Sequence, residues 1–88
     1  MKLIKFWAGW CAPCRQQSAL LEGFTEAEVV SVDVEDPESE PLVQEYGIRN
    51  LPTMILVDDD GDAVERFAGL TGLDRIRDAI AKARERQG

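Results

Sequence analysis

Two cysteines, Cys11 and Cys14, are the side chains of this 88-residue chain best suited to covalent chemistry. They stand three residues apart in the segment WCAPC, after a short apolar run and before a helical pattern. At the start of a helix, side chains with this spacing share one face, so two thiols can approach bonding distance. The spacing therefore predicts a reversible disulfide between them.

The place of each cysteine relative to the helix predicts unequal roles. Cys11, at or next to the N-cap, faces unpaired backbone N–H groups and the positive end of the helix dipole, which stabilise a thiolate. Once Cys11 has attacked a substrate disulfide, the tethered Cys14 can attack the mixed disulfide that forms. Pro13 between them stiffens the first turn. Such a pair completes a two-electron exchange, and no cofactor is expected.

Two structural roles for the cysteines compete with redox chemistry. A disulfide that closes so short a loop stabilises a protein by about 2 kcal/mol, which is little for a chain in a reducing compartment. Zinc usually takes four ligands, and this sequence has no histidine and no third cysteine, so no metal is expected. A redox pair is favoured, because Cys-X-X-Cys after a strand and opening a helix is the typical redox context.

The segments around the cysteines have the patterns of alternating strands and helices. Four short segments are apolar, valine-rich or alternating, as strands are: residues 2–7, 28–34, 53–57 and 63–68. Three segments have helical signals: about 11–24, 39–46 before Gly47, and the amphipathic stretch after Thr71. Thr71 and Asp74 resemble a capping box for the last helix, and Asp60-Gly61 predicts a hairpin between the last two strands.

The order β-α-β-α-β-β-α is that of an α/β fold. The first two strands, joined through a helix, should be parallel with a right-handed crossover, and the hairpin strands should be antiparallel. A chain of this length rarely holds two hydrophobic cores, so residues 1–88 are expected to form a single domain.

Charge and composition disfavour several classes of binding partner. Seventeen acidic and ten basic residues give a formal net charge of -7, which disfavours nucleic acid and anionic lipid surfaces. The acidic excess lies in residues 33–62, where Arg49 is the only base, and is interpreted as a solvated flank. No stretch approaches the ~20 apolar residues of a membrane span, and no signal-peptide pattern precedes Cys11. With two cysteines in the chain, a cytoplasmic setting is expected.

Two segments of the chain resemble a known family. FWAGWCAPC is similar to the active-site segment of thioredoxins, and YGIRNLPT resembles the loop that carries the family's cis-proline. The resemblance covers nearly the whole chain and begins at the family's second strand. It implies a minimal thioredoxin fold, a four-stranded mixed sheet of order 2-1-3-4 with three helices. The resemblance further implies that the protein is a monomer, that it reduces protein disulfides, and that it receives electrons from a donor similar to thioredoxin reductase.

The resemblance also implies roles for individual residues. Cys11 would be the exposed attacking thiol and Cys14 the more buried resolving thiol. The other implied positions are active-site surface or substrate contacts: Trp10, Pro13, Leu51, Pro52 and Gly69. Pro52 would be the cis-proline, which presents the backbone of Leu51 to an extended substrate beside Cys11. A simple strand-entry proline and a hairpin glycine remain the alternatives at Pro52 and Gly69.

Departures from the family pattern leave the direction of electron flow open. Lys5 stands where the family has a buried aspartate, and Ser31, Ala12 and Ala19 replace a lysine, a glycine and a proline. A buried Lys5 must reach water, find an acidic partner, lose its proton, or lie against a thiolate, where it would stabilise the thiolate or transfer a proton. A disulfide oxidase or isomerase, or a thioredoxin-like binding subunit, therefore remains an alternative to a reductase.

Overall fold

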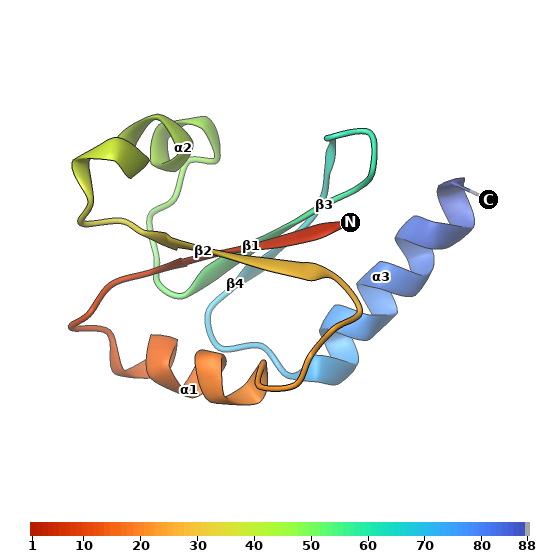
Figure 1. Cartoon of the computed structure of the whole chain (residues 1–88), viewed down its shortest axis with the longest axis horizontal. Coiled ribbons are helices and arrows are strands. Elements are labelled where there is room, and N and C mark those ends of the chain that lie inside the picture. The colour runs from red at the N-terminus through yellow and green to blue at the C-terminus, as the bar shows by residue number, and fades with distance from the viewer. Residues whose placement is uncertain (88) are drawn as a thin grey trace.

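The computed structural model describes residues 1–87, which form a mixed sheet with helices on both of its sides (Figure 1). The strands are β1 (Lys2–Trp7), β2 (Glu28–Asp33), β3 (Thr53–Val57) and β4 (Ala63–Ala68). The helices are α1 (Ala12–Leu20), α2 (Glu40–Glu45) and α3 (Leu73–Gln87), with a 3-10 turn η1 (Pro37–Ser39) before α2. The predicted order of elements is confirmed.

Within residues 1–87, the sheet has four strands in the order β2-β1-β3-β4. β1 pairs in parallel with β2 and antiparallel with β3, and β3 pairs antiparallel with β4. Helix α1 makes the crossover that a parallel pair requires. The predicted α/β fold and strand order are therefore confirmed, and β1, which leads into the cysteine segment, is an interior strand.

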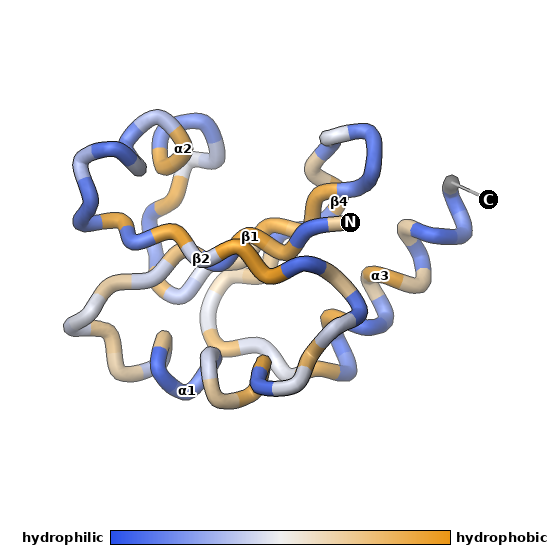
Figure 2. Tube along the Cα trace, in the orientation of Figure 1, coloured by the Kyte–Doolittle hydropathy of each residue, from blue (hydrophilic) through white to orange (hydrophobic). Residues whose placement is uncertain are grey.

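Apolar side chains fill the space on both faces of the sheet. On the face covered by α1 and α3, Leu3, Met54 and Phe67 are fully buried against Ile76 and Ile80. The other face packs its own cluster, including Phe6 and Ile55, against α2 and the loop that follows it. Figure 2 shows apolar strands inside and polar segments on the outer helices and on the turn between β3 and β4. Central β3, buried at every position, is the continuous apolar run that a strand covered on both faces needs.

Helix α1 is shorter than predicted. It ends at Leu20, and residues 21–24 form a turn in which Gly23 adopts a φ of 77°. This left-handed conformation stops the helix at little cost in a residue without a side chain. Leu21 and Phe24 are still buried in the core, so their apolar spacing belongs to a turn and not to the continuing helix that it predicts.

The predicted start of α2 is confirmed, with Ser39 as the N-cap and Glu40 and Pro41 in the first turn, whereas the predicted cap of α3 differs. A 3-10 turn precedes α2, and Asp36, whose side chain accepts a hydrogen bond from the Glu38 N–H at 3.0 Å, caps that turn. The capping box at Thr71 is wrong, because the Thr71 hydroxyl donates to the Gly69 carbonyl at 2.9 Å instead of accepting from the helix. α3 begins at Leu73, with Asp74 in its first turn.

Candidate active site

The cysteine segment lies where the interior strand β1 turns into α1. The Cys11 N–H donates to the Ala8 carbonyl at 3.1 Å, which closes the turn after β1. Cys11 is the N-cap of α1, with an extended backbone, and its Sγ accepts a hydrogen bond from the Cys14 N–H at 3.2 Å. Pro13 fits in the first turn, where a missing N–H removes no helical hydrogen bond. A thiolate at Cys11 would keep this N–H donor and face the positive helix end.

Cys11 and Cys14 form a disulfide with a Cα–Cα distance of 5.3 Å. Their residues are 4% and 2% exposed, so in this oxidised state Cys11 is not the exposed thiol that the family resemblance implied. The reason is local packing, since Ala8, Trp7 and Leu51 surround the bridge. What distinguishes the two cysteines is their place on the helix, with Cys11 at the cap and Cys14 inside the first turn.

The loop before β3 lies against this disulfide. The Leu51–Pro52 peptide bond is cis, and the Pro52 carbonyl accepts a hydrogen bond from the Gly69 N–H at 2.8 Å. Gly69 has a φ of 84°, a conformation that favours glycine. Among the hydrogen bonds of residues 1–87, none uses the backbone N–H or C=O of Leu51. A free donor and acceptor therefore lie beside the disulfide, as pairing with an extended peptide requires.

A shallow groove runs from this loop to the exposed indole of Trp10. Trp10 is 69% exposed and lines a cavity of about 340 Å³ together with Leu51 and Arg49. Val34, Val43 and Ile48 form its apolar wall. The structure thus brings Trp10 and Leu51 into one groove and packs Leu51 against the cysteines. Pro13, which stands between Cys11 and Cys14 in the chain, is exposed.

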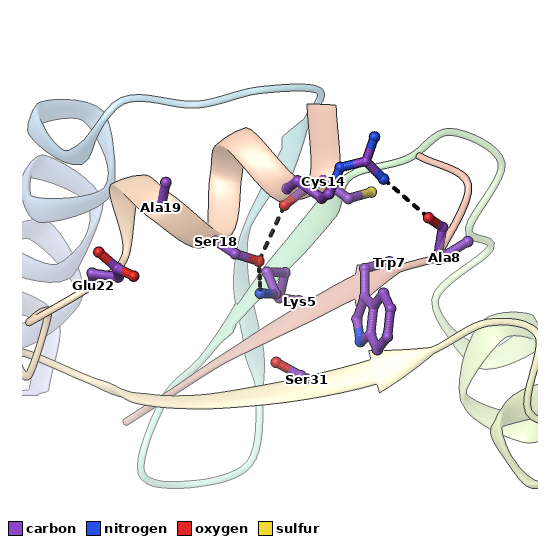
Figure 3. Close-up of a pocket in the computed structure, with 10 residues that line it drawn as sticks. Lys5, Trp7, Ala8, Cys14, Ser18, Ala19, Glu22 and Ser31 are labelled. Atoms are coloured by element: carbon purple, nitrogen blue, oxygen red, sulfur yellow. Dashed lines mark hydrogen bonds between the residues drawn. The ribbon is translucent and has the colours of Figure 1, made fainter. Parts of the chain in front are cut away.

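Lys5 lies beneath α1 (Figure 3). Because side chains alternate along a strand, it shares a face of β1 with Leu3 and Trp7. The residue is 7% exposed, and its ammonium donates to Ser18 Oγ at 2.6 Å. Ser18 Oγ in turn donates to the Cys14 carbonyl at 3.1 Å. Burial lowers the pKa of the Lys5 ammonium below its ordinary value. Lys5 has therefore found a hydroxyl partner, which was not among the partners that the sequence suggested.

A polar contact that sequence reasoning missed connects α1 to the loop after β4. The Gln17 side chain donates to the Thr71 carbonyl at 2.9 Å and accepts from the Thr71 N–H at 2.8 Å. Gln17 is fully buried, three residues after Cys14 on the same helix face. The sequence signal for this contact was a glutamine on the buried face of a helix, where a polar side chain needs a hydrogen-bond partner. The contact fixes the loop whose Gly69 holds Pro52.

Residues 1–87 contain no group of three or more His, Cys, Asp or Glu side chains placed to hold a metal ion. No helix in the same part of the chain has the length and apolar character needed to cross a membrane.

Comparisons with known proteins match this fold and site. The thioredoxin family model matches residues 1–82. The thioredoxin of Alicyclobacillus acidocaldarius is 34% identical over 85 residues, which are 90% of this chain and 77% of that protein. The thioredoxin of Chlamydia caviae is 39% identical over 77 residues, 84% of this chain and 74% of that protein.

A solved structure gives the same result. A mutant thioredoxin from Halobacterium salinarum superposes with a TM-score of 0.81 at 34% identity, covering 93% of this chain and 73% of that one. The match includes the fold, and the cysteine pair at the start of α1 forms the disulfide that thiol exchange requires. The chain therefore belongs to the thioredoxin family and is a thiol-disulfide oxidoreductase.

Proposed function

We propose that this protein reduces disulfide bonds in other proteins, with Cys11 as the nucleophile and Cys14 as the resolving thiol. The observation that carries the proposal is the Cys11–Cys14 disulfide at the N-terminus of α1, with Cys11 as the N-cap. A helix N-terminus stabilises thiolate at the cap more than at a position inside the first turn. Cys11 is therefore the better nucleophile.

The exchange proceeds in two displacements. The Cys11 thiolate attacks one sulfur of the substrate disulfide, the substrate S–S bond breaks, and the second substrate sulfur leaves as a thiolate that takes up a proton. Cys14, as a thiolate, then attacks Cys11 Sγ. The Cys11–Cys14 bond forms, the mixed disulfide breaks, and the first substrate sulfur leaves. The substrate gains two electrons and the protein loses two.

We infer that the groove beside the disulfide binds an extended segment of the substrate. The unpaired N–H and C=O of Leu51 can form main-chain hydrogen bonds with such a segment. The exposed indole of Trp10 offers apolar contact at the other side of the groove. Pro13 completes the surface around the sulfurs, and Gly69 and Pro52 hold the loop in place.

The redox partners follow from the electron count. Because each turnover leaves Cys11 and Cys14 oxidised, a two-electron donor similar to thioredoxin reductase must return the pair to the dithiol. We assign no cofactor to the chain itself, since the disulfide carries both electrons. The proposed setting is the cytoplasm, where dithiols are kept reduced, and there the protein acts as a monomer in electron transport and redox homeostasis.

The test is the reduction of insulin disulfides by dithiothreitol, with and without the protein. The wild type is expected to accelerate the reaction, and Cys11→Ser is expected to abolish the acceleration, because it removes the attacking sulfur. Gln16→Ser, a substitution at an exposed position of α1, is the matched control and should retain activity. Full activity in Cys11→Ser would refute the nucleophile assignment.

The second variant of the same experiment separates the two roles. Cys14→Ser keeps the nucleophile and removes the resolving thiol, so mixed disulfides between Cys11 and substrate should accumulate and be seen by mass spectrometry. Adducts on Cys14 in Cys11→Ser, with none on Cys11 in Cys14→Ser, would reverse the roles. A cellular function that survives loss of both cysteines would identify a binding subunit instead of a reductase.

A further inference from the structure

A buried cation lies under the cysteine pair. Figure 3 shows the Lys5 side chain rising from β1 toward Ser18, with Cys14 on the same side of α1 above it. The ammonium is linked to the Cys14 backbone through two hydrogen bonds, 2.6 Å from Lys5 Nζ to Ser18 Oγ and 3.1 Å from Ser18 Oγ to the Cys14 carbonyl. Lys5 and Cys14 also line the same cavity of about 480 Å³.

The charges around Lys5 leave its ammonium unneutralised. Within residues 1–87, none of the ion pairs involves Lys5. Its strand neighbours in register are Ser31 on β2 and Met54 on β3, and both are uncharged. Besides Lys5, the charged groups on the shared cavity are Arg15 of α1 and Glu22, which follows that helix.

Neither of these two groups neutralises the ammonium. The Arg15 guanidinium donates to the Gly9 carbonyl at 3.1 Å, in the turn before α1. Glu22 follows the end of α1, at the far end of the helix from Cys14 (Figure 3). The titratable group above Lys5 is thus Cys14 itself.

The redox states of the pair differ in charge, and Lys5 acts on that difference. The disulfide is neutral, whereas the dithiol form can carry a thiolate. A fixed positive charge stabilises the charged thiolate but does not stabilise the neutral disulfide to the same extent. Stabilising the reduced form makes a pair a stronger oxidant. A neutral side chain at the same place would leave the pair more reducing.

We propose that the Lys5 ammonium, held by Ser18, is a positioning charge that stabilises thiolate at Cys14 and shifts the Cys11–Cys14 equilibrium toward the dithiol. The proposal rests on the proposed thiol exchange and adds a determinant of its direction. In the second displacement the proton of Cys14 leaves to solvent, and the ammonium keeps its own proton while the thiolate attacks Cys11 Sγ. Lys5 touches neither substrate nor the reacting sulfur and acts through the field at Cys14.

The test compares redox equilibria in glutathione buffers and thiolate titrations by alkylation with iodoacetamide. Lys5→Met keeps the apolar stem and removes the charge. Lys2→Met removes the same charge from an exposed position of the same strand and is the matched control. For Lys5→Met we expect an equilibrium about tenfold further toward the disulfide, equivalent to about 30 mV, and a thiolate midpoint higher by about one pH unit. Lys2→Met should change neither.

A second variant keeps the ammonium and removes the group that holds it. Ser18→Ala should shift both readouts in the same direction as Lys5→Met, by a smaller amount. Circular dichroism verifies the fold of each variant, and Lys5→Gln takes the place of Lys5→Met should the latter not fold.

Three results would overturn the proposal: both readouts unchanged in Lys5→Met, an equal shift in Lys2→Met, or an unchanged equilibrium with only the second displacement slowed. The last result would identify a neutral Lys5 that accepts the Cys14 proton. A wild type that shows no reversible exchange with glutathione would instead refute the proposed function, so the two failures are distinguishable.

Discussion

At the scale of single residues, Lys5 carries a cost that an apolar residue in its place would avoid. The side chain is 7% exposed and has one hydroxyl acceptor, Ser18 Oγ, for an ammonium that can donate three hydrogen bonds. Desolvation penalises the charged form, and the lowered pKa of Lys5 reports that penalty. A residue that tunes the cysteine pair is thus expected to reduce the stability of the fold.

We expect Lys5→Met to raise the free energy of unfolding at neutral pH, as measured by urea denaturation of the oxidised protein. The pKa of Lys5 is lowered in the folded state from an ordinary value of 10.5. The penalty is therefore complete below the folded-state pKa and is lost as the pH rises through it toward 10.5. The gain from Lys5→Met should shrink over that window. An unchanged or larger gain at high pH would contradict this account.

At the scale of elements, α1 does more than present the cysteines. Its buried Gln17 forms two hydrogen bonds with the Thr71 backbone, and Gly69 in the same loop donates to Pro52. The helix, the β4–α3 loop and the cis-proline loop are thereby connected by hydrogen bonds to backbone groups. This chain of contacts keeps Leu51 beside the cysteine pair.

Gln17→Ala should lower the free energy of unfolding by about 2–4 kcal/mol, because two buried backbone groups of Thr71 lose their partners. Urea denaturation monitored by circular dichroism measures the change. Gln16→Ala, an exposed substitution one residue earlier, should stay within about 0.5 kcal/mol of the wild type. A loss for Gln17→Ala no greater than that of the control would show that the loop is fixed by its packing instead.

At the scale of the whole molecule, the net charge affects substrates before they reach the active site. The net charge is -7, and residues 33–62, which carry most of the acids, include the loop beside the cysteine pair. Arg49, which lines the groove with Trp10, is the only base in that stretch. The field of the protein should attract basic substrates and repel acidic ones at a distance, before contact in the groove.

The rate constant for reduction of a basic disulfide peptide should fall roughly tenfold as ionic strength rises from about 0.01 M to about 1 M, where screening shortens from about 30 Å to about 3 Å. An acidic peptide of the same length should be reduced faster over the same range. Stopped-flow kinetics with the reduced protein measures both. Equal salt dependence for the two peptides would show that electrostatic steering has no part in substrate choice.

The sequence by itself determined the features that depend on neighbouring residues. Strand patterns, the hairpin signal at Asp60-Gly61 and the Cys11–Cys14 spacing gave the element order and the redox pair, because periodicity and turn chemistry act over a few residues. The strand order and the cis bond at Pro52 followed from the resemblance to the family. Local patterns were misleading at the end of α1, where Leu21 and Phe24 keep apolar spacing through a turn.

Only the tertiary structure decided contacts between distant residues. Gln17 and Thr71 are 54 positions apart, and Lys5 and Ser18 are 13 apart. The sequence showed that a lysine on a buried strand face needed a partner, and the packing of α1 on β1 supplied the serine. The packing of Ala8, Trp7 and Leu51 around the disulfide likewise buried Cys11, which the family resemblance implied to be exposed. Which polar groups meet in a folded chain depends on how elements pack, and that depends on all side chains between them.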